Sequence, residues 1–167
     1  MNKLAALVLF TITVGYGCIN PNQTIVIDPT ISFNIPRKTE FTIKESIFPK
    51  IWEASLEDGL ITVYKYSINQ GDTITNDSLK QQLKKNVDAF LKSFDLKHID
   101  STYTFQKEYF QSDLSFDYVS NGVEYKFFSK MVANRQNFVV FCFQTPSPID
   151  NYSQRLKDKI FNSIDIK

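Results

Sequence analysis

The pattern of apolar and polar residues predicts two groups of strands, each followed by a helix. Short runs that alternate, or that are rich in β-branched and aromatic residues, are typical of strands. Before the first helix, such runs occupy 24–27, 31–35, 51–56 and 60–68. Between the helices, they occupy 99–107, 114–119, 123–132 and 137–145. The last of these runs is the most apolar, which predicts a central strand buried on both faces.

Two turn signals predict hairpins. Glu57-Asp58-Gly59 separates the strands 51–56 and 60–68, and Asn121-Gly122 separates 114–119 from 123–132. Asp-Gly and Asn-Gly are favoured in tight hairpin turns because these turns need positive φ angles. The strands on either side of each signal are therefore expected to pair in antiparallel fashion.

Two segments have the periodicity of helices with one buried face. In the first, apolar residues recur three and four positions apart; they are Leu79, Leu83, Val87, Phe90, Leu91 and Phe94. Asn76, Asp77 and Ser78 are candidate caps of that helix, and Ser78 with Gln81 fits a capping box. The second helix is expected over 151–163, with Asp150 as its cap. Its expected buried residues are Tyr152, Leu156, Ile160 and Ile164.

This order of elements predicts an α+β fold, an antiparallel sheet packed by two main helices, in a single domain over 24–167. Three features make the chain similar to the PsbP-like family, which includes PsbP, the lipoprotein DcrB and a Ran-binding import factor. They are the hairpin 114–132, the apolar strand 138–143 ending at Pro146, and the final helix ending in Phe161-Asn162-Ser163-Ile164. The resemblance covers about residues 30–167. It implies an α/β/α sandwich and a binding or assembly role more readily than catalysis.

The first residues resemble a bacterial lipoprotein export signal. Lys3 supplies positive charge, 4–14 is an uncharged apolar run, and Gly15-Tyr16-Gly17 precedes Cys18. Gly15 departs from the usual pattern, in which leucine stands three residues before the cysteine. We expect 1–17 to be a signal peptide, Cys18 to become the lipid-bearing first residue, and 18–23 to form a tether. The alternatives are secretion with an unmodified cysteine and an uncleaved signal anchor, although the run is short for a membrane span.

Charge and composition exclude some classes of partner. The net charge is +1, whereas binding to a phosphate backbone requires a strongly basic surface, so no nucleic-acid partner is expected. The 15 Phe and 8 Tyr residues predict a well-packed interior. The expected contacts are with the membrane, through the lipid on Cys18, and with an unidentified envelope protein.

Candidate chemical groups are few, and no enzyme activity, metal site or cofactor is predicted. His98 is the only histidine, and no nucleophile elbow, glycine-rich phosphate loop or zinc motif occurs. His98 with Asp100 is expected to be a surface pair, and the carboxylates of Asp113 and Asp117 to be solvated. Cys142 lies in an apolar strand and is expected to be a buried structural thiol.

The sequence leaves two kinds of binding function open. Tyr109 and Phe110 are adjacent aromatic residues in the polar stretch 106–113 between strands. Exposed, they are candidate partner-binding residues; buried, they would fasten the loop to the core. The leading hypothesis is a noncatalytic cell-envelope lipoprotein that acts as a binding or assembly module. The alternative is a lipoprotein that binds a small ligand or a glycan in a concave aromatic pocket.

Lipidation of Cys18 is directly testable. Mass spectrometry of the mature protein is expected to show an N-terminal cysteine carrying two or three acyl chains, because the small residues before Cys18 provide a cleavage site. Cys18→Ala is expected to leave the protein unacylated. A mature chain with an unmodified cysteine, or one that retains Met1, would refute the assignment.

Overall fold

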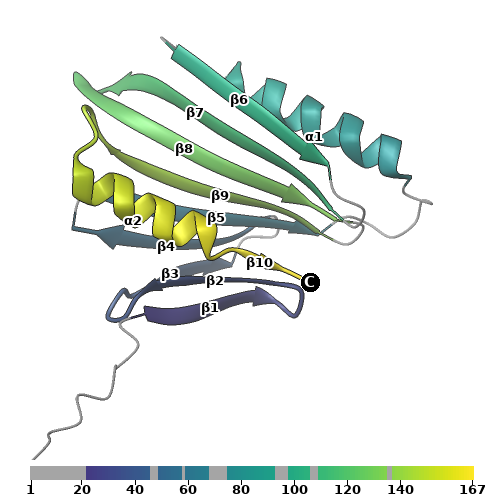
Figure 1. The fold of residues 1–167 in the computed structure, drawn as a ribbon, viewed down its shortest axis with the longest axis horizontal. Helices are drawn as coiled ribbons and strands as arrows, with labels where there is room; N and C mark the ends of the chain where they lie inside the picture. Colours follow the sequence, from purple (N-terminus) through teal and green to yellow (C-terminus); the bar gives the residue numbers. More distant parts are fainter. Residues whose placement is uncertain are drawn as a thin grey trace, which may run out of the picture.

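The computed structural model describes residues 22–45, 49–57, 59–67, 75–92, 98–105, 109–134 and 137–167. The chain forms two antiparallel sheets and two helices (Figure 1). The large sheet has seven strands in the order β3-β4-β5-β9-β8-β7-β6. Its strands are β3 (Thr42–Glu45), β4 (Lys50–Leu56), β5 (Gly59–Ser67), β6 (His98–Phe105), β7 (Phe110–Ser120), β8 (Val123–Ala133) and β9 (Asn137–Pro146). The prediction that the strand at 137–145 is central is confirmed.

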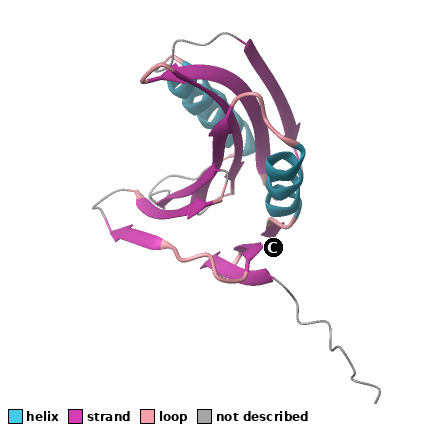
Figure 2. Cartoon of the chain, turned by 90° about the vertical axis from the view of Figure 1, so that its left-hand side faces the viewer, coloured by secondary structure: helices cyan, strands magenta, loops and turns pink. Residues whose placement is uncertain are grey.

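The small sheet was not predicted as a separate layer. It has the order β1-β2-β10 and consists of β1 (Asn22–Asp28), β2 (Ile31–Pro36) and β10 (Asp165–Ile166). The helices are α1 (Asn76–Leu91) and α2 (Asn151–Asn162). Figure 2 shows the pronounced twist of the large sheet, and the α+β fold with two main helices is confirmed.

The two predicted hairpins form, for different local reasons. Asn121 and Gly122 have φ angles of 51° and 77°, as expected of an Asn-Gly turn. Gly59 does not have the positive φ angle that we expected. A Cβ atom on Gly59 would lie 2.7 Å from the carbonyl oxygen of Gln144 on β9, so glycine is required there by close packing of backbone.

Strand alternation gives the large sheet two apolar faces. We call the side with Leu114, Phe116 and Val140 the α1 face, because these residues form one core with Leu79 and Leu83 of α1. The rings of Phe116 and Phe127 stack in this core with centroids 4.8 Å apart. Helix α1 lies mainly against β7 and β8. It therefore covers one part of the α1 face more closely than the rest.

The opposite side, the α2 face, carries the other core. Phe141 and Phe143 of β9 and Val63 of β5 are fully buried there, beneath α2 and the small sheet. The ring of Phe33, from β2, meets that of Phe141 edge-on with centroids 5.4 Å apart. The small sheet is thus a covering layer, a role that its short, Pro-flanked strands did not indicate.

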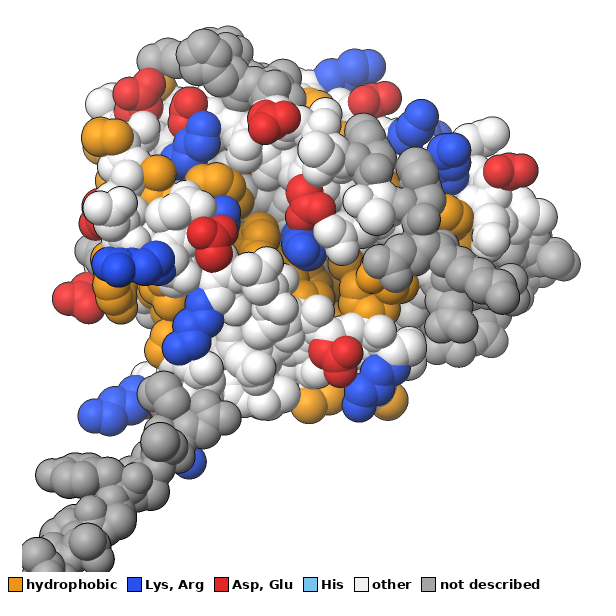
Figure 3. Space-filling view, viewed as in Figure 1, with side chains coloured by type: hydrophobic (Ala, Val, Ile, Leu, Met, Phe, Trp, Pro, Cys, Tyr) orange, Lys and Arg blue, Asp and Glu red, His pale blue; other side chains and the backbone are white. Residues whose placement is uncertain are grey.

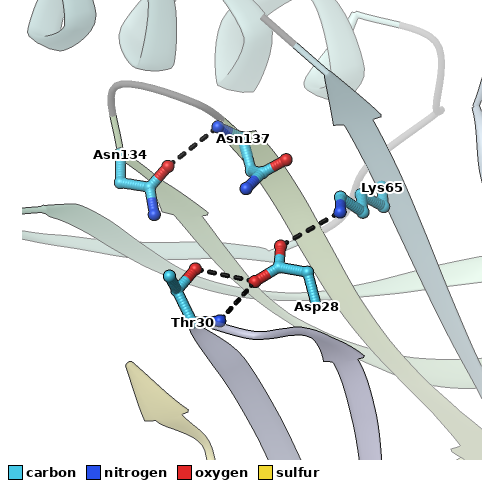
Figure 4. Close-up of polar contacts among 5 residues, drawn as sticks. All are labelled: Asp28, Thr30, Lys65, Asn134 and Asn137. Atoms are coloured by element: carbon cyan, nitrogen blue, oxygen red, sulfur yellow. Dashed lines mark hydrogen bonds and ion pairs between the residues drawn. The ribbon is translucent and has the colours of Figure 1, made fainter. Parts of the chain in front are cut away.

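An ion pair joins the small sheet to the large one. The Asp28 carboxylate at the end of β1 lies 3.1 Å from the ammonium of Lys65 on β5 (Figure 4). The backbone N–H and the hydroxyl of Thr30 donate to the same carboxylate, each at 2.7 Å. Burial acts to raise the pKa of Asp28, but the bonds from Thr30 and Lys65 outweigh it and leave the pKa lowered. Asp28 therefore stays charged in this partly buried position.

The helix ends correct some details of the prediction. Thr75, not Ser78, caps α1: its hydroxyl accepts the Ser78 N–H at 3.2 Å, so the helix begins one turn earlier than a cap at Ser78 implies. Asp150 caps α2 as predicted, accepting the Ser153 N–H at 2.6 Å. Tyr152 was expected to be buried but is 47% exposed. The buried residues of α2 are Ser153, Leu156, Ile160 and Phe161.

The apolar stripe predicted for α1 is confirmed where the structure describes it. Leu79, Leu83 and Val87 are buried. Leu91 is half-buried against the same core. Phe94 and the side chain of Phe90 lie outside the described residues, as does Asp58 in the first hairpin.

Tyr109 and Phe110 lie at the start of β7 and pack into different cores. Phe110 is 7% exposed and belongs to the core beneath α1. Tyr109 is half-buried and packs against the core beneath α2. Adjacent residues of an extended chain point to opposite faces of a sheet, so the pair does not form one exposed aromatic surface.

Both cores are built from residues within 25–166. A chain that starts at Ile19 therefore contains every described element of the fold. Such a chain lacks Cys18 and keeps Cys142 as its single cysteine, which makes it suitable for measurements in solution.

Removal of the Phe110 ring tests this packing. Phe110→Ala is expected to lower the free energy of unfolding by about 3–5 kcal/mol, because it leaves a cavity beneath α1. Val119→Ala, on the same strand but 51% exposed, is the control and is expected to cost about 0.5 kcal/mol or less. Urea titration of the chain 19–167 measures both. A stable Phe110→Ala variant that loses a binding partner would instead support a contact role for this residue.

Candidate functional site

A pocket of about 690 Å³ lies between α1 and the part of the α1 face formed by β5 and β9. We call it the α1 pocket. Its described lining residues are Tyr64, Tyr66, Ser67, Ser78, Leu79, Gln82, Leu83, Asn86, Ala89, Met131, Ala133, Phe138 and Val140. The volume is within the range of about 300–1,000 Å³ that is common for small-molecule sites. Helix α1 makes most of its described contacts with β7 and β8, and the pocket lies between it and β5.

Strand alternation places the sheet wall of the pocket. Tyr64 and Tyr66 of β5 stand opposite Val140 and Phe138 of β9 in the antiparallel register. The rings of Tyr66 and Phe138 are 5.7 Å apart. This wall is mostly aromatic and aliphatic, and its polar groups are the two phenol hydroxyls and the hydroxyl of Ser67.

The turn between β8 and β9 holds one end of this wall in place. The N–H of Asn137 donates to Oδ1 of Asn134 at 2.8 Å (Figure 4), and the N–H of Asn134 donates to the carbonyl of Asn137 at 3.0 Å. Ala133 and Phe138 flank this turn and both line the pocket. The turn therefore fixes two lining residues through its own hydrogen bonds.

Helix α1 supplies the other wall, and the side chains on this wall are uncharged. Ser78, Gln82, Asn86 and Ala89 recur at spacings of four, four and three, which places them along one side of the helix. The amide of Gln82 donates to Oδ1 of Asn86 at 3.4 Å. The charged residues of α1 do not line the pocket; in the described helix they are Asp77, Lys80, Lys84, Lys85 and Asp88.

The ionisable side chains among the described lining residues are Tyr64 and Tyr66, and both stay neutral. Burial raises the pKa of both Tyr64 and Tyr66, so their hydroxyls remain protonated at physiological pH. Beneath them, burial raises the pKa of the Cys142 thiol to about 12. The prediction that Cys142 is a buried structural thiol is thus confirmed.

A second groove lies beside α2. It has a volume of about 570 Å³ and is lined by the turn after β2, by β4 and by the first turn of α2, including Tyr152. Its lining is mostly polar, and much of it is exposed to solvent. Charges of both signs are interspersed over this side of the molecule (Figure 3). The α1 pocket is more enclosed and more apolar, so we treat it as the candidate site.

The remaining predicted residues lie apart from the α1 pocket. Tyr109 and Phe110 do not line it. Asp113 and Asp117 form ion pairs with Lys130 at 3.5 Å and Lys126 at 3.2 Å on the α2 face. His98 is the first residue of β6, but its side chain lies outside the described residues. Within the described ranges, no three His, Cys, Asp or Glu residues cluster in a way that could hold a metal ion.

Sequence reasoning assigned Tyr64 and Tyr66 to the core and did not identify the pocket. One signal was available: the uncharged residues Ser78, Gln82 and Asn86 recur every four positions along a helix that is otherwise rich in lysine.

Lipidation of Cys18 stays a prediction, since Cys18 lies outside the described residues. In the part of α1 and α2 that the structure describes, neither helix is long and apolar enough to cross a membrane.

No protein-family model matches the sequence, and no curated protein matches it as a relative. Solved structures do share its fold. Cyanobacterial PsbP (CyanoP) from Synechocystis aligns with a TM-score of 0.62 and 16% identity over 92% of this chain and 96% of its own.

Two further structures align less closely. LpqN, which is described as involved in cell envelope biogenesis of Mycobacterium tuberculosis, aligns with a TM-score of 0.52 and 14% identity over 89% of this chain and 92% of its own. A protein from Bacteroides thetaiotaomicron aligns with a TM-score of 0.51 and 13% identity, and this chain spans 49% of its length. At these identities the similarity establishes the fold, and the fold is PsbP-like.

Proposed function

We propose that this protein is a noncatalytic cell-envelope lipoprotein, held at the membrane by a lipid on Cys18, whose domain binds a small ligand in the α1 pocket. The pocket itself carries the proposal. It combines apolar lining residues with hydroxyl and amide groups from β5 and α1. This combination is typical of small-molecule sites, in which apolar surface provides affinity and a few polar groups set orientation.

The envelope location rests on the N-terminal sequence. A charged residue, an apolar run and small residues precede Cys18, as in exported lipoproteins. The fold shared with LpqN, a protein of cell envelope biogenesis, supports the same location. Fold similarity alone does not define activity.

The noncatalytic assignment rests on the roles of the ionisable groups. A nucleophilic cysteine needs an accessible thiolate, whereas the Cys142 thiol is buried and has a pKa of about 12. Asp113 and Asp117 are paired with lysines across neighbouring strands. These pairs give both carboxylates a partner within the sheet.

The distribution of exposed apolar residues favours a small ligand over a protein partner. Val119 and Val123 flank one turn, but their register puts them on opposite faces of the hairpin. Val26, Ile43 and Tyr152 belong to three other elements. Single exposed apolar residues are normal on protein surfaces. In the described part of the chain, the concave pocket is therefore the stronger indication of function.

Filling the pocket tests the proposal. The probe is N-phenyl-1-naphthylamine, a neutral apolar dye that fluoresces more strongly in apolar surroundings. The chain 19–167 is expected to bind it saturably, at one site. Asn86→Trp, which adds an indole ring on the pocket side of α1, is expected to weaken binding at least about tenfold, which corresponds to about 1.4 kcal/mol.

Lys85→Trp is the matched control, because it adds the same ring at the neighbouring position, which is exposed and does not line the pocket. It is expected to bind the dye like the unmodified chain. Circular dichroism checks that both variants are folded. Equal dye binding by the two variants, or no saturable binding by the unmodified chain, would contradict the proposed function.

A further inference from the structure

The lining of the α1 pocket constrains the charge of its ligand. Among the 13 described lining residues, none has an ionised side chain. The polar groups are the phenols of Tyr64 and Tyr66, the amides of Gln82 and Asn86, and the hydroxyls of two serines. All of these both donate and accept hydrogen bonds without a net charge.

One described pair of charges lies on the same face as the sheet wall. On the α1 face beyond β5, Glu53 of β4 pairs with Lys44 of β3 at 3.2 Å. Burial is the main cause of the raised pKa of Tyr64. Among the described lining residues, an anionic group placed at Tyr64 would therefore meet no cation.

Because the described lining is uncharged, the cost of desolvation favours uncharged ligand groups over charged ones. A carboxylate or phosphate that leaves water for a partly apolar site needs a cation or several donors to offset the loss of hydration. Uncharged hydroxyl and amide groups lose much less on the same transfer, and they match the hydrogen-bonding capacity of the phenols and amides.

We infer that the α1 pocket takes a neutral amphiphile. Its apolar chain lies against Leu79, Leu83 and Val140, and its uncharged hydroxyl- or amide-bearing head lies between the two tyrosines and the Gln82–Asn86 side of α1. This inference rests on the proposed function and adds the chemical class of the ligand. Both concern the same site. The neutral class of ligand can be wrong even if the pocket does bind ligands.

The experiment compares two ligands that have the same acyl chain and different head groups. Monolauroylglycerol and laurate, each below its critical micelle concentration, compete with N-phenyl-1-naphthylamine for the chain 19–167. The monoacylglycerol is expected to displace the dye at a concentration at least about tenfold lower than laurate does, a difference of about 1.4 kcal/mol. Equal or better displacement by laurate, or displacement by neither, would overturn the neutral class while leaving dye binding intact.

A single added cation provides the internal control. Gln82→Lys introduces a charge on the pocket side of α1, whereas Gln81→Lys makes the same change at an exposed neighbour that does not line the pocket. Glutamine and lysine have similar helix propensities, so both variants are expected to fold normally. Gln82→Lys is expected to improve laurate binding several-fold, and Gln81→Lys to leave it unchanged. The same response from both variants would overturn the inference, and absence of dye binding would remove the proposed function and the inference together.

Discussion

The structure depends on covering both faces of the central strand β9. Apolar side chains alternate along this strand, with Phe141 and Phe143 on one side and Val140 and Cys142 on the other. A strand of this kind is stable only when both sides are removed from water. Helix α2 and the small sheet cover the α2 face, and on the other face Val140 and Cys142 share a core with α1. Within the sheet, β5 and β8 pair with β9 on its two edges.

The layers on the two faces bury the large sheet to different extents. The candidate site lies on the less fully buried face. On the α2 face, Phe33 packs on Phe141, and the Asp28–Lys65 pair fastens the small sheet to β5. On the α1 face, one helix lies over β7 and β8 and leaves Tyr64 and Tyr66 half-buried. A single helix of 16 residues is too narrow to cover a seven-stranded sheet. In the described part of the chain, the rest of this face forms a pocket with one aromatic wall and one wall of uncharged helix side chains.

Much of the fold was predictable because its signals are local. The Asn121-Gly122 turn, the Asp150 cap and the stripe Leu79–Leu83–Val87 each act within a few residues of sequence. The small sheet was not predictable in this way, because β10 pairs with β2 from the far end of the chain. Gly59 was predicted for the wrong reason, since its close neighbour Gln144 belongs to a distant strand. The α1 pocket was missed for a related cause: it depends on where a helix comes to lie on a sheet, and periodicity does not encode that position.

The central claim is that one face of this domain, and not the other, receives a neutral ligand. Nuclear magnetic resonance of the isotope-labelled chain 19–167, titrated with monolauroylglycerol, tests this most directly. The claim predicts that chemical shifts change at Tyr64, Tyr66 and Phe138 and along Ser78–Ala89. It also predicts that Trp52, in the core beneath α2, is unaffected. Changes centred on α2 and the groove at Tyr152, with the α1 side unchanged, would contradict it.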